Sequence, residues 1–192
     1  TYEIYNGQDL IYLNNKFRGI RMIYYSEYQN LYKILNSNID MQTRLSLCKK
    51  VIMTIKNLYN QGVAYHDIHT DNIIVREDDA KLVDMDGSIL LSSCDKEALK
   101  LINHRIKINT IILVLSCYYK KDFHDIIDLI KKRVIDKNDL LIFFPFDFKS
   151  YAEQFYNEEN INLGFEFILS FFEDEKVKTL KKFDISYYKY NK

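Results

Sequence analysis

A long amphipathic segment constrains the fold of this chain more than any other feature. Apolar residues recur at spacings of three and four over residues 40–61, and this period predicts one helix with a single buried stripe. Asp40 stands where the N-cap of such a helix is expected, and Gly62 follows where the helix should end. The stripe consists of Leu45, Val51, Ile52, Ile55, Leu58 and Tyr59. This helix is therefore expected to bury one face against the rest of the chain.

Short segments rich in β-branched and aromatic residues lie on the N-terminal side of this helix. Strands are predicted over residues 2–5, 10–13 and 20–25, and a short helix over 31–35. On the other side, a polar loop over residues 65–72 leads into a predicted hairpin. Its strands, 73–75 and 81–83, are expected to pair across a turn at 76–80.

The second half of the chain is predominantly helical in pattern. Helices are expected over residues 95–103, 107–119, 122–135, 148–157 and 161–173. With one proline and five glycines, the 192 residues contain no flexible linker. The length suits one domain and is too short for two ordinary ones. The predicted class is α+β, a small sheet followed by a mostly helical body, in a single domain over residues 1–192.

Composition excludes several classes of function. The 27 basic and 27 acidic side chains balance, so no overall field draws the chain to nucleic acid or to an anionic membrane. The sixteen tyrosines are scattered without interleaved basic clusters, which disfavours stacking on bases. The longest uncharged stretch, residues 108–119, is short of the ~20 residues that a membrane span needs.

The three cysteines indicate a reducing environment. Cys48, Cys94 and Cys117 are odd in number, widely spaced and without a C-x-x-C pair, which disfavours both a disulfide scaffold and a zinc knuckle. An intracellular, cytoplasmic location is expected, with secretion as an effector left open.

Three oxygen-bearing side chains carry the chemistry that the sequence predicts. Asp67 and Asn72 are five residues apart in the polar loop, and Asp84 ends the second strand of the hairpin. Because a hairpin folds back on itself, Asn72 at its entrance and Asp84 at its exit should be neighbours. A site with only a few hard oxygen ligands suits Mg²⁺, because this ion keeps waters and completes its shell with substrate phosphates.

These residues resemble the protein kinase superfamily. Its H-R-D-L-x-x-x-N and D-F-G motifs correspond to Y-H-D-I-H-T-D-N at residues 65–72 and D-M-D-G at 84–87. The resemblance covers about residues 20–119 and extends to the long helix and the buried helix at 107–119. It implies a kinase-like fold of atypical, bacterial or viral type, with a mostly helical C-lobe and a reduced or truncated N-lobe. Residues 1–25 would then be a remnant of the N-lobe strands, and 26–192 the hinge and the C-lobe.

The resemblance also implies roles for single residues. Asp67 matches the aspartate that accepts or orients the proton of the substrate hydroxyl, and Asn72 and Asp84 match the two metal ligands. His69 takes the place of a lysine that touches the γ-phosphate. The nucleotide-binding positions are Ile23 at the gatekeeper, Tyr24, Tyr25 and Ser26 at the hinge, and Ile74 and Val83 under the adenine ring.

Several positions depart from the family pattern. Tyr65 replaces the histidine of the loop, where an aromatic ring can fill the same packing position. Met85 and Asp86 replace Phe and Gly, and Asp86 is either a further metal ligand or a polar turn residue. Asn109 stands where the buried helix normally offers an aspartate to the backbone of the catalytic loop. No A-P-E motif follows, so the peptide-docking segment is cut down or absent.

The front of the family pattern is missing from the sequence. It holds no G-x-G-x-x-G loop, and neither the V-A-I-K lysine nor its glutamate partner can be placed before residue 20. The cleft is therefore expected to be completed by an upstream segment, by a partner or by self-association, or else to bind nucleotide nearly open.

The expected function is an ATP-dependent phosphotransferase that requires Mg²⁺ or Mn²⁺ and phosphorylates a hydroxyl group. The acceptor is a protein Ser/Thr or a small molecule, and the missing A-P-E favours the second. The alternative is a catalytically weak pseudokinase that acts as a binding or regulatory module. A transition-metal site at His66, Asp67 and His69 is disfavoured, because an HD-type phosphohydrolase needs a further histidine upstream and none precedes His66.

Overall fold

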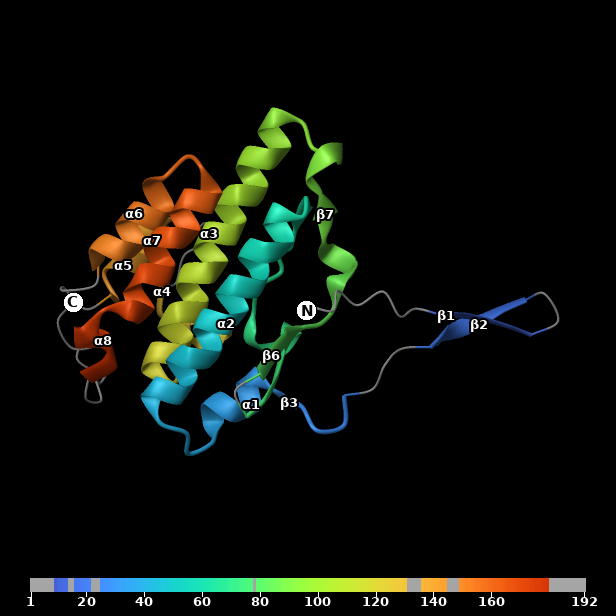
Figure 1. The fold of residues 1–192 in the computed structure, drawn as a ribbon, viewed down its shortest axis with the longest axis horizontal. Coiled ribbons are helices and arrows are strands. Elements are labelled where there is room, and N and C mark those ends of the chain that lie inside the picture. The colour runs from blue at the N-terminus through green and yellow to red at the C-terminus, as the bar shows by residue number, and fades with distance from the viewer. Residues whose placement is uncertain are drawn as a thin grey trace.

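Helices make up most of the described chain, and its strands form three small antiparallel sheets (Figure 1). The structure is a computed structural model that describes residues 9–13, 16–21, 25–77, 79–130, 136–144 and 149–179. The helices are α1 (Leu31–Asn36), α2 (Met41–Asn60), α3 (Lys96–Tyr119), α4 (Phe123–Ile130), α5 (Lys137–Leu141), α6 (Lys149–Asn157), α7 (Ile161–Glu173) and α8 (Glu175–Thr179). The strands are β1 (Asp9–Leu13), β2 (Lys16–Arg21), β3 (Gln29–Asn30), β4 (Val63–Ala64), β5 (Ile73–Arg76), β6 (Asp79–Leu82) and β7 (Ile89–Leu90).

Helix α2 has the caps that the sequence predicts. The Asp40 carboxylate accepts the backbone N–H of Thr43 at 2.9 Å and so satisfies one of the free donors of the first turn. At the other end, Gly62 has a φ of +85°, a conformation that costs a glycine nothing. All but one of the predicted stripe residues are buried, and Tyr59 packs partly buried against the core.

Helix α3 runs through the middle of the body, in contact with α2, α4, α5 and α6 (Figure 1). The sequence predicts two helices here, over 95–103 and 107–119, and this prediction is wrong, because α3 is continuous. His104 and Arg105 suggest a break because they are polar, but both lie on the exposed side of the helix. Ile102 and Ile106, one turn apart, are buried and continue the apolar stripe across the expected gap.

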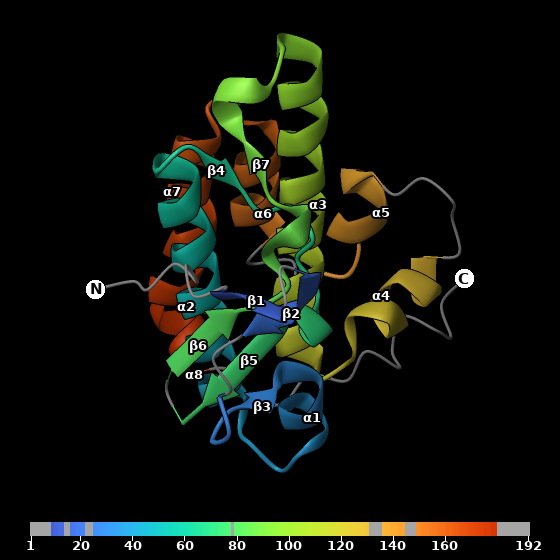
Figure 2. The same ribbon diagram turned by 90° about the vertical axis from the view of Figure 1, so that its right-hand side faces the viewer.

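Helices α6 and α7 pack against each other on the far side of the body (Figure 2), where α7 contacts α2 and α6 contacts α3. Gly164 on α7 lies so close to α6 that a Cβ there would come within 3.1 Å of the Phe155 carbonyl oxygen. The predicted helices at 148–157 and 161–173 are confirmed. Helix α4 starts at Phe123, and residues 131–135 of the predicted helix 122–135 lie outside the described ranges.

The hairpin β5–β6 pairs tightly, and β3 adds a third strand beside β5. Its ladder runs from Ile73 opposite Leu82 to Arg76 opposite Asp79. The turn is therefore shorter than the predicted 76–80, and strand β6 ends one residue before Val83. Ile73 and Leu82 are buried on the face that packs on α2, while Ile74 and Lys81 share the outer, half-buried face.

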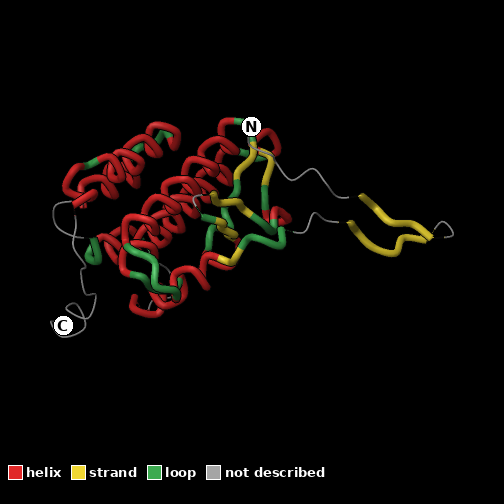
Figure 3. The backbone as a smooth tube through the Cα atoms, turned by 60° about the horizontal axis from the view of Figure 1, so that its bottom comes forward, coloured by secondary structure: helices red, strands yellow, loops and turns green. Residues whose placement is uncertain are grey.

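Strands β1 and β2 form a sheet of their own, which stands apart from the helical body in Figures 1 and 3. The predicted strand at 10–13 is confirmed, but its partner begins at Lys16, four residues before the predicted strand at 20–25. The predicted strand at 2–5 lies outside the described residues. None of the helices in the described ranges has the length and hydropathy that crossing a bilayer requires.

Candidate functional site

The loops 65–72 and 84–87 meet beyond the C-terminal end of α2, because the short strands next to them pair with each other. Strand β4 leads into the loop 65–72 and pairs antiparallel with β7, which follows the loop 84–87. A hydrogen bond of 2.8 Å from the Leu91 amide to the Gly62 carbonyl extends this pairing. As a result, Gly87 lies against Asp67, and a Cβ at Gly87 would be 3.7 Å from that of Asp67.

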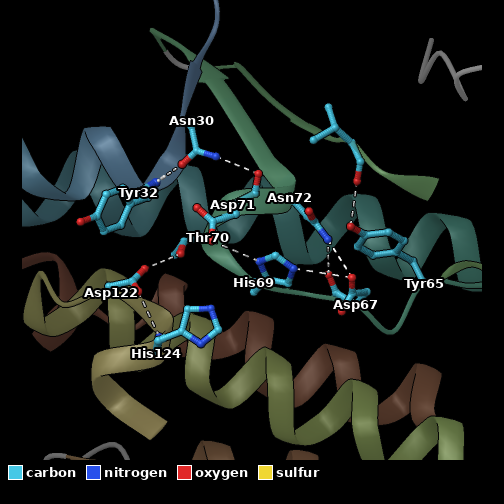
Figure 4. A network of polar contacts seen from close by, with 11 residues as sticks. Asn30, Tyr32, Tyr65, Asp67, His69, Thr70, Asp71, Asn72, Asp122 and His124 are labelled. Carbon is cyan, nitrogen blue, oxygen red and sulfur yellow. Dashed lines mark hydrogen bonds and ion pairs between the residues drawn. The ribbon is translucent and has the colours of Figure 1, made fainter. Parts of the chain in front are cut away.

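Asn72 holds Asp67 in place through two hydrogen bonds (Figure 4). Its Nδ2 donates to the Asp67 carboxylate at 2.9 Å and to the Asp67 carbonyl at 3.2 Å. An amide has its donors on the nitrogen alone, so Oδ1 of Asn72 is turned away from Asp67. Asn72 is 7% exposed, whereas the Asp67 side chain keeps 44% of its surface open to solvent. The loop thus presents a fixed carboxylate and, beside it, an amide oxygen.

Asp84 is brought to the same end of the hairpin. The Val83 amide donates to the Asn72 carbonyl at 2.9 Å, which joins the entrance of the hairpin to its exit as the sequence predicts. Asp84 follows directly, is exposed, and has left-handed backbone angles of φ 57° and ψ 62°. Such a conformation is uncommon for a residue with a Cβ and tends to occur at functional sites.

Tyr65 joins the loop 65–72 to the residue before Asp84. Its ring is fully buried and its hydroxyl donates to the Val83 carbonyl at 2.9 Å. Burial, and secondarily the charge of Asp67, raises the pKa of Tyr65 well above its ordinary value, so the hydroxyl stays protonated as a donor. Tyr65 thus links the loop to the residue before Asp84.

His69 lies between two carboxylates. Its Nε2 is 3.6 Å from Asp67 Oδ2, and its Nδ1 is 3.8 Å from Asp71 Oδ2. On a third side, its ring centroid is 6.2 Å from the rings of Phe123 and of His124 at the start of α4. His69 is therefore next to Asp67, and its imidazole can interact with a group bound at that carboxylate.

Two further anchors fix the backbone of the loop. Asn109 on α3 donates its Nδ2 to the His66 carbonyl at 2.8 Å. Thr70 is fully buried, and its Oγ1 donates to Asp122 Oδ1 at 2.6 Å. Sequence reasoning does not find Asp122, because it lies 52 residues further along the chain and no motif marks it. The aliphatic hydroxyl of Thr70 is the one local signal that such a partner exists.

Three of the positions predicted to bind nucleotide, Tyr25, Ile74 and Val83, lie on the outer face of β5–β6 or at its edge. Ile74 and Val83 are half-buried, as an accessible apolar surface requires. Tyr25 is half-buried beside them, with the Lys81 ammonium 5.6 Å from its ring centroid, and its carbonyl accepts the Tyr28 amide at 3.1 Å. The predicted positions Ser26, which is exposed, and Ile23 and Tyr24, which lie outside the described residues, complete the set.

The oxygen donors fit a hard divalent cation that relies on its substrate for further ligands. The donors would be Asn72 Oδ1, a neutral amide oxygen, and the anionic carboxylate of Asp84. In the described ranges, no group of three or more His, Cys, Asp and Glu side chains is gathered closely enough to hold a metal on its own. A donor set of two oxygens suits Mg²⁺ or Mn²⁺ with phosphate oxygens and water better than it suits a closed protein cage.

The comparisons with known proteins do not add to this picture. No protein-family model matches the chain, and no curated protein matches it significantly. The assignment of a function therefore rests on the geometry of the loops 65–72 and 84–87.

Proposed function

We propose that this chain is the helical catalytic lobe of a protein-kinase-like phosphotransferase. It uses ATP with Mg²⁺ or Mn²⁺ and phosphorylates a hydroxyl group. One observation carries the proposal: a buried amide, that of Asn72, orients the open carboxylate of Asp67, while the hairpin closure places Asp84 at the same end. In phosphoryl transfer the protein mainly positions groups and stabilises charge, and these three side chains have the chemistry for both tasks.

Each residue of the site has a separate task in this proposal. Asp67 accepts the proton of the attacking hydroxyl, and Asn72 keeps its carboxylate from turning away. Asn72 Oδ1 and Asp84 would hold the cation, which neutralises phosphate charge when it is bound. His69, 3.6 Å from Asp67, donates a hydrogen bond to the group in transfer and stabilises the charge that develops there.

The outer face of β5–β6 offers the surface for the base. Ile74 on β5 and Val83, just after β6, are both half-buried, and Val83 directly precedes Asp84. Apolar side chains that are half-buried without ligand lose their remaining water contact when an adenine ring covers them, which favours binding. Tyr25, at the edge of this face, is the described hinge residue nearest to it.

The acceptor in this proposal is a small molecule in preference to a protein. Only Leu91–Ser93, in one helical turn, and two further residues separate β7 from α3. A peptide needs an extended surface to lie on, and a segment this short provides little of it. The free thiols of Cys48, Cys94 and Cys117 agree with an intracellular site of action.

The substitution Asp67→Asn tests the catalytic assignment. The side chain is open and lies in a polar loop, so the variant should fold and bind ATP as the wild type does. Transfer, measured as ADP formation with water or an added alcohol as acceptor, should fall by ~10²-fold or more, the effect of losing a general base. Asp125→Asn, an exposed carboxylate on α4, serves as the control and should leave the rate unchanged.

Two outcomes would argue against the proposal. Undiminished transfer in Asp67→Asn would show that this carboxylate does not act on the acceptor. Metal-dependent ATP binding without any turnover in the wild type would favour a regulatory module of the same fold.

A further inference from the structure

The hydrogen bond between Thr70 and Asp122 joins the loop 65–72 to the start of α4. Thr70 is 0% exposed and its hydroxyl donates at 2.6 Å to a carboxylate oxygen. Bonds of this length from O–H to a charged oxygen are among the strong ones in proteins. A buried hydroxyl in this position has no water to replace its partner, so the bond fixes the two segments against each other.

The second oxygen of Asp122 is engaged as well. Oδ2 accepts the His124 amide at 3.2 Å, and the Asp122 carbonyl accepts the Ile126 amide at 3.2 Å. Asp122 therefore caps the first turn of α4. One residue joins the start of this helix to the turn Thr70–Asn72 that carries both His69 and Asn72 at its ends.

The ring of His69 contacts side chains at the start of α4. The rings of Phe123 and His124 are each 6.2 Å from the His69 ring, centroid to centroid, and 5.9 Å from each other. Figure 4 shows His124 on the same side of the loop as His69, with Asp122 beside Thr70. If Thr70 released Asp122, these rings would be free to move away from His69.

Asn72, in contrast, is held by other groups. It bonds to Asp67 through its own side chain, and its carbonyl accepts the Val83 amide at 2.9 Å. The Asp71 carbonyl is held from the opposite side by Asn30 Nδ2 at 2.7 Å. Loss of the Thr70–Asp122 bond should therefore disturb His69 and leave the proposed metal ligand Asn72 in place.

We propose that Asp122 is a positioning residue for the transfer step, which acts through Thr70 and the start of α4 to hold His69 beside Asp67. The inference rests on the proposed phosphotransferase function. It assigns Asp122 an effect on the rate of transfer and almost none on the binding of metal and nucleotide.

The test compares Thr70→Val and Asp122→Ser with the wild type. Valine has the shape of threonine without the hydroxyl, and serine can still cap α4 but is too short to reach Thr70. In both variants the kcat of ATP hydrolysis, with water as the acceptor, should fall about 10-fold. The KM for Mg–ATP should change by less than about threefold, because the loss affects the transition state alone.

Three controls separate positioning from a general loss of structure. Thr70→Ser keeps the hydroxyl and should restore most of the rate. Thr110→Val alters a threonine that is also 0% exposed but whose hydroxyl has no hydrogen-bond partner among the described residues, and its rate should equal that of the wild type. Circular dichroism at the assay temperature checks that every variant is fully folded, and the double variant Thr70→Val/Asp122→Ser should be no slower than either single one.

The outcomes keep the two proposals apart. A wild type that neither binds nor hydrolyses Mg–ATP would contradict the proposed function itself. A wild type that does both, with Thr70→Val and Asp122→Ser as fast as Thr110→Val, would overturn the role of Asp122 alone. Equal losses in kcat and in nucleotide affinity would overturn it too, since the bond would then support the whole site.

Discussion

At residue 109 the proposed kinase resemblance would place a carboxylate, and this chain has an amide. A carboxylate can only accept hydrogen bonds, whereas Asn109 donates one of 2.8 Å to the carbonyl of His66. The side chain thus ties α3 to the loop 65–72 as a hydrogen-bond donor. The amide at this position is therefore sufficient to anchor the backbone of the loop to α3.

The substitution Asn109→Asp tests this role of the amide as a donor. A carboxylate facing the His66 carbonyl loses the bond and adds repulsion, so the free energy of unfolding should drop by about 1–3 kcal/mol. Asn109→Ala, which removes the bond without adding a charge, should cost less. Urea denaturation measures both. If Asn109→Asp were as stable as the wild type, the carboxylate would be accepting backbone N–H groups, and the amide would have no special part.

His66 gives the stability of the protein a dependence on pH. Burial, and then the charge of Arg105, lowers the pKa of His66 below its ordinary value. Its Nδ1 is buried and has no hydrogen-bond partner within the part of the chain that the structure describes. The unfolded chain, with a histidine pKa of about 6.5, thus binds this proton more readily than the folded chain. Stability from His66 is complete above about pH 7 and is lost as the pH falls from about 6.5 through the lower folded value.

Urea denaturation at pH 7.5 and pH 5.5 measures this dependence. The wild type should lose stability between the two values, and His66→Gln should lose less of it. His104→Gln, which alters an exposed histidine on α3, should behave as the wild type does. An equal loss in wild type and His66→Gln would assign the dependence to other groups.

The residues of the site differ in how far the sequence alone predicts them. Asp67 and Asn72 lie within one loop, so their spacing already implies their contact. Asp84 requires only the hairpin, whose alternation of apolar residues is local. Asp122 could not be predicted. It meets its partner Thr70 only because α3 and α4 pack beside the loop, and no local sequence pattern indicates that contact.

At the scale of elements, predictions succeed where a helix carries its own boundary signals. Helix α2 has Asp40 and Gly62, and α7 follows Asn160, whose side chain accepts the Asn162 amide. Helix α3 is predicted as two helices because the polar residues His104 and Arg105 interrupt its apolar residues, although both lie on its exposed side. The start of strand β2 is missed, because Lys16, Arg18 and Gly19 are not the apolar residues that indicate a strand.

Arg44 joins the two longest helices and should matter greatly for stability. It is 7% exposed, and its guanidinium donates to the carbonyls of Cys117 at 2.7 Å, Ile39 at 2.8 Å and Tyr118 at 3.3 Å. Two of these belong to the last turn of α3, where carbonyls lack partners within the helix. One side chain on α2 thus caps α3 from the side.

Arg44→Met should lower the free energy of unfolding by about 2–3 kcal/mol, because it leaves buried carbonyls without donors while it keeps much of the apolar volume. Arg105→Met on the exposed side of α3 should change it by no more than about 0.5 kcal/mol. Both are measured by urea denaturation. Equal effects of the two substitutions would mean that solvent reaches the end of α3 and replaces the guanidinium.

For the whole molecule, the helical body holds the proposed catalytic groups and the β1–β2 sheet stands beside it (Figure 3). The body alone provides the loop 65–72, the hairpin and the apolar outer face of that hairpin. A two-stranded sheet has little stability by itself, so β1–β2 is expected to gain from a partner strand, whether from the same chain, a second copy or another protein. The central claim concerns the body: that Asn72 and Asp84 share a cation bound with a nucleotide.

Thermal and urea unfolding with Mg–ATP, compared with ATP and a chelator, tests that claim most directly. A ligand at 100 times its Kd should add about 2.7 kcal/mol to the free energy of unfolding. The gain should appear with Mg²⁺ or Mn²⁺, shrink sharply with chelator and in Asp84→Asn, and persist in Asp125→Asn. Stabilisation by ATP that is the same with and without metal, or none with either cation, would contradict the account.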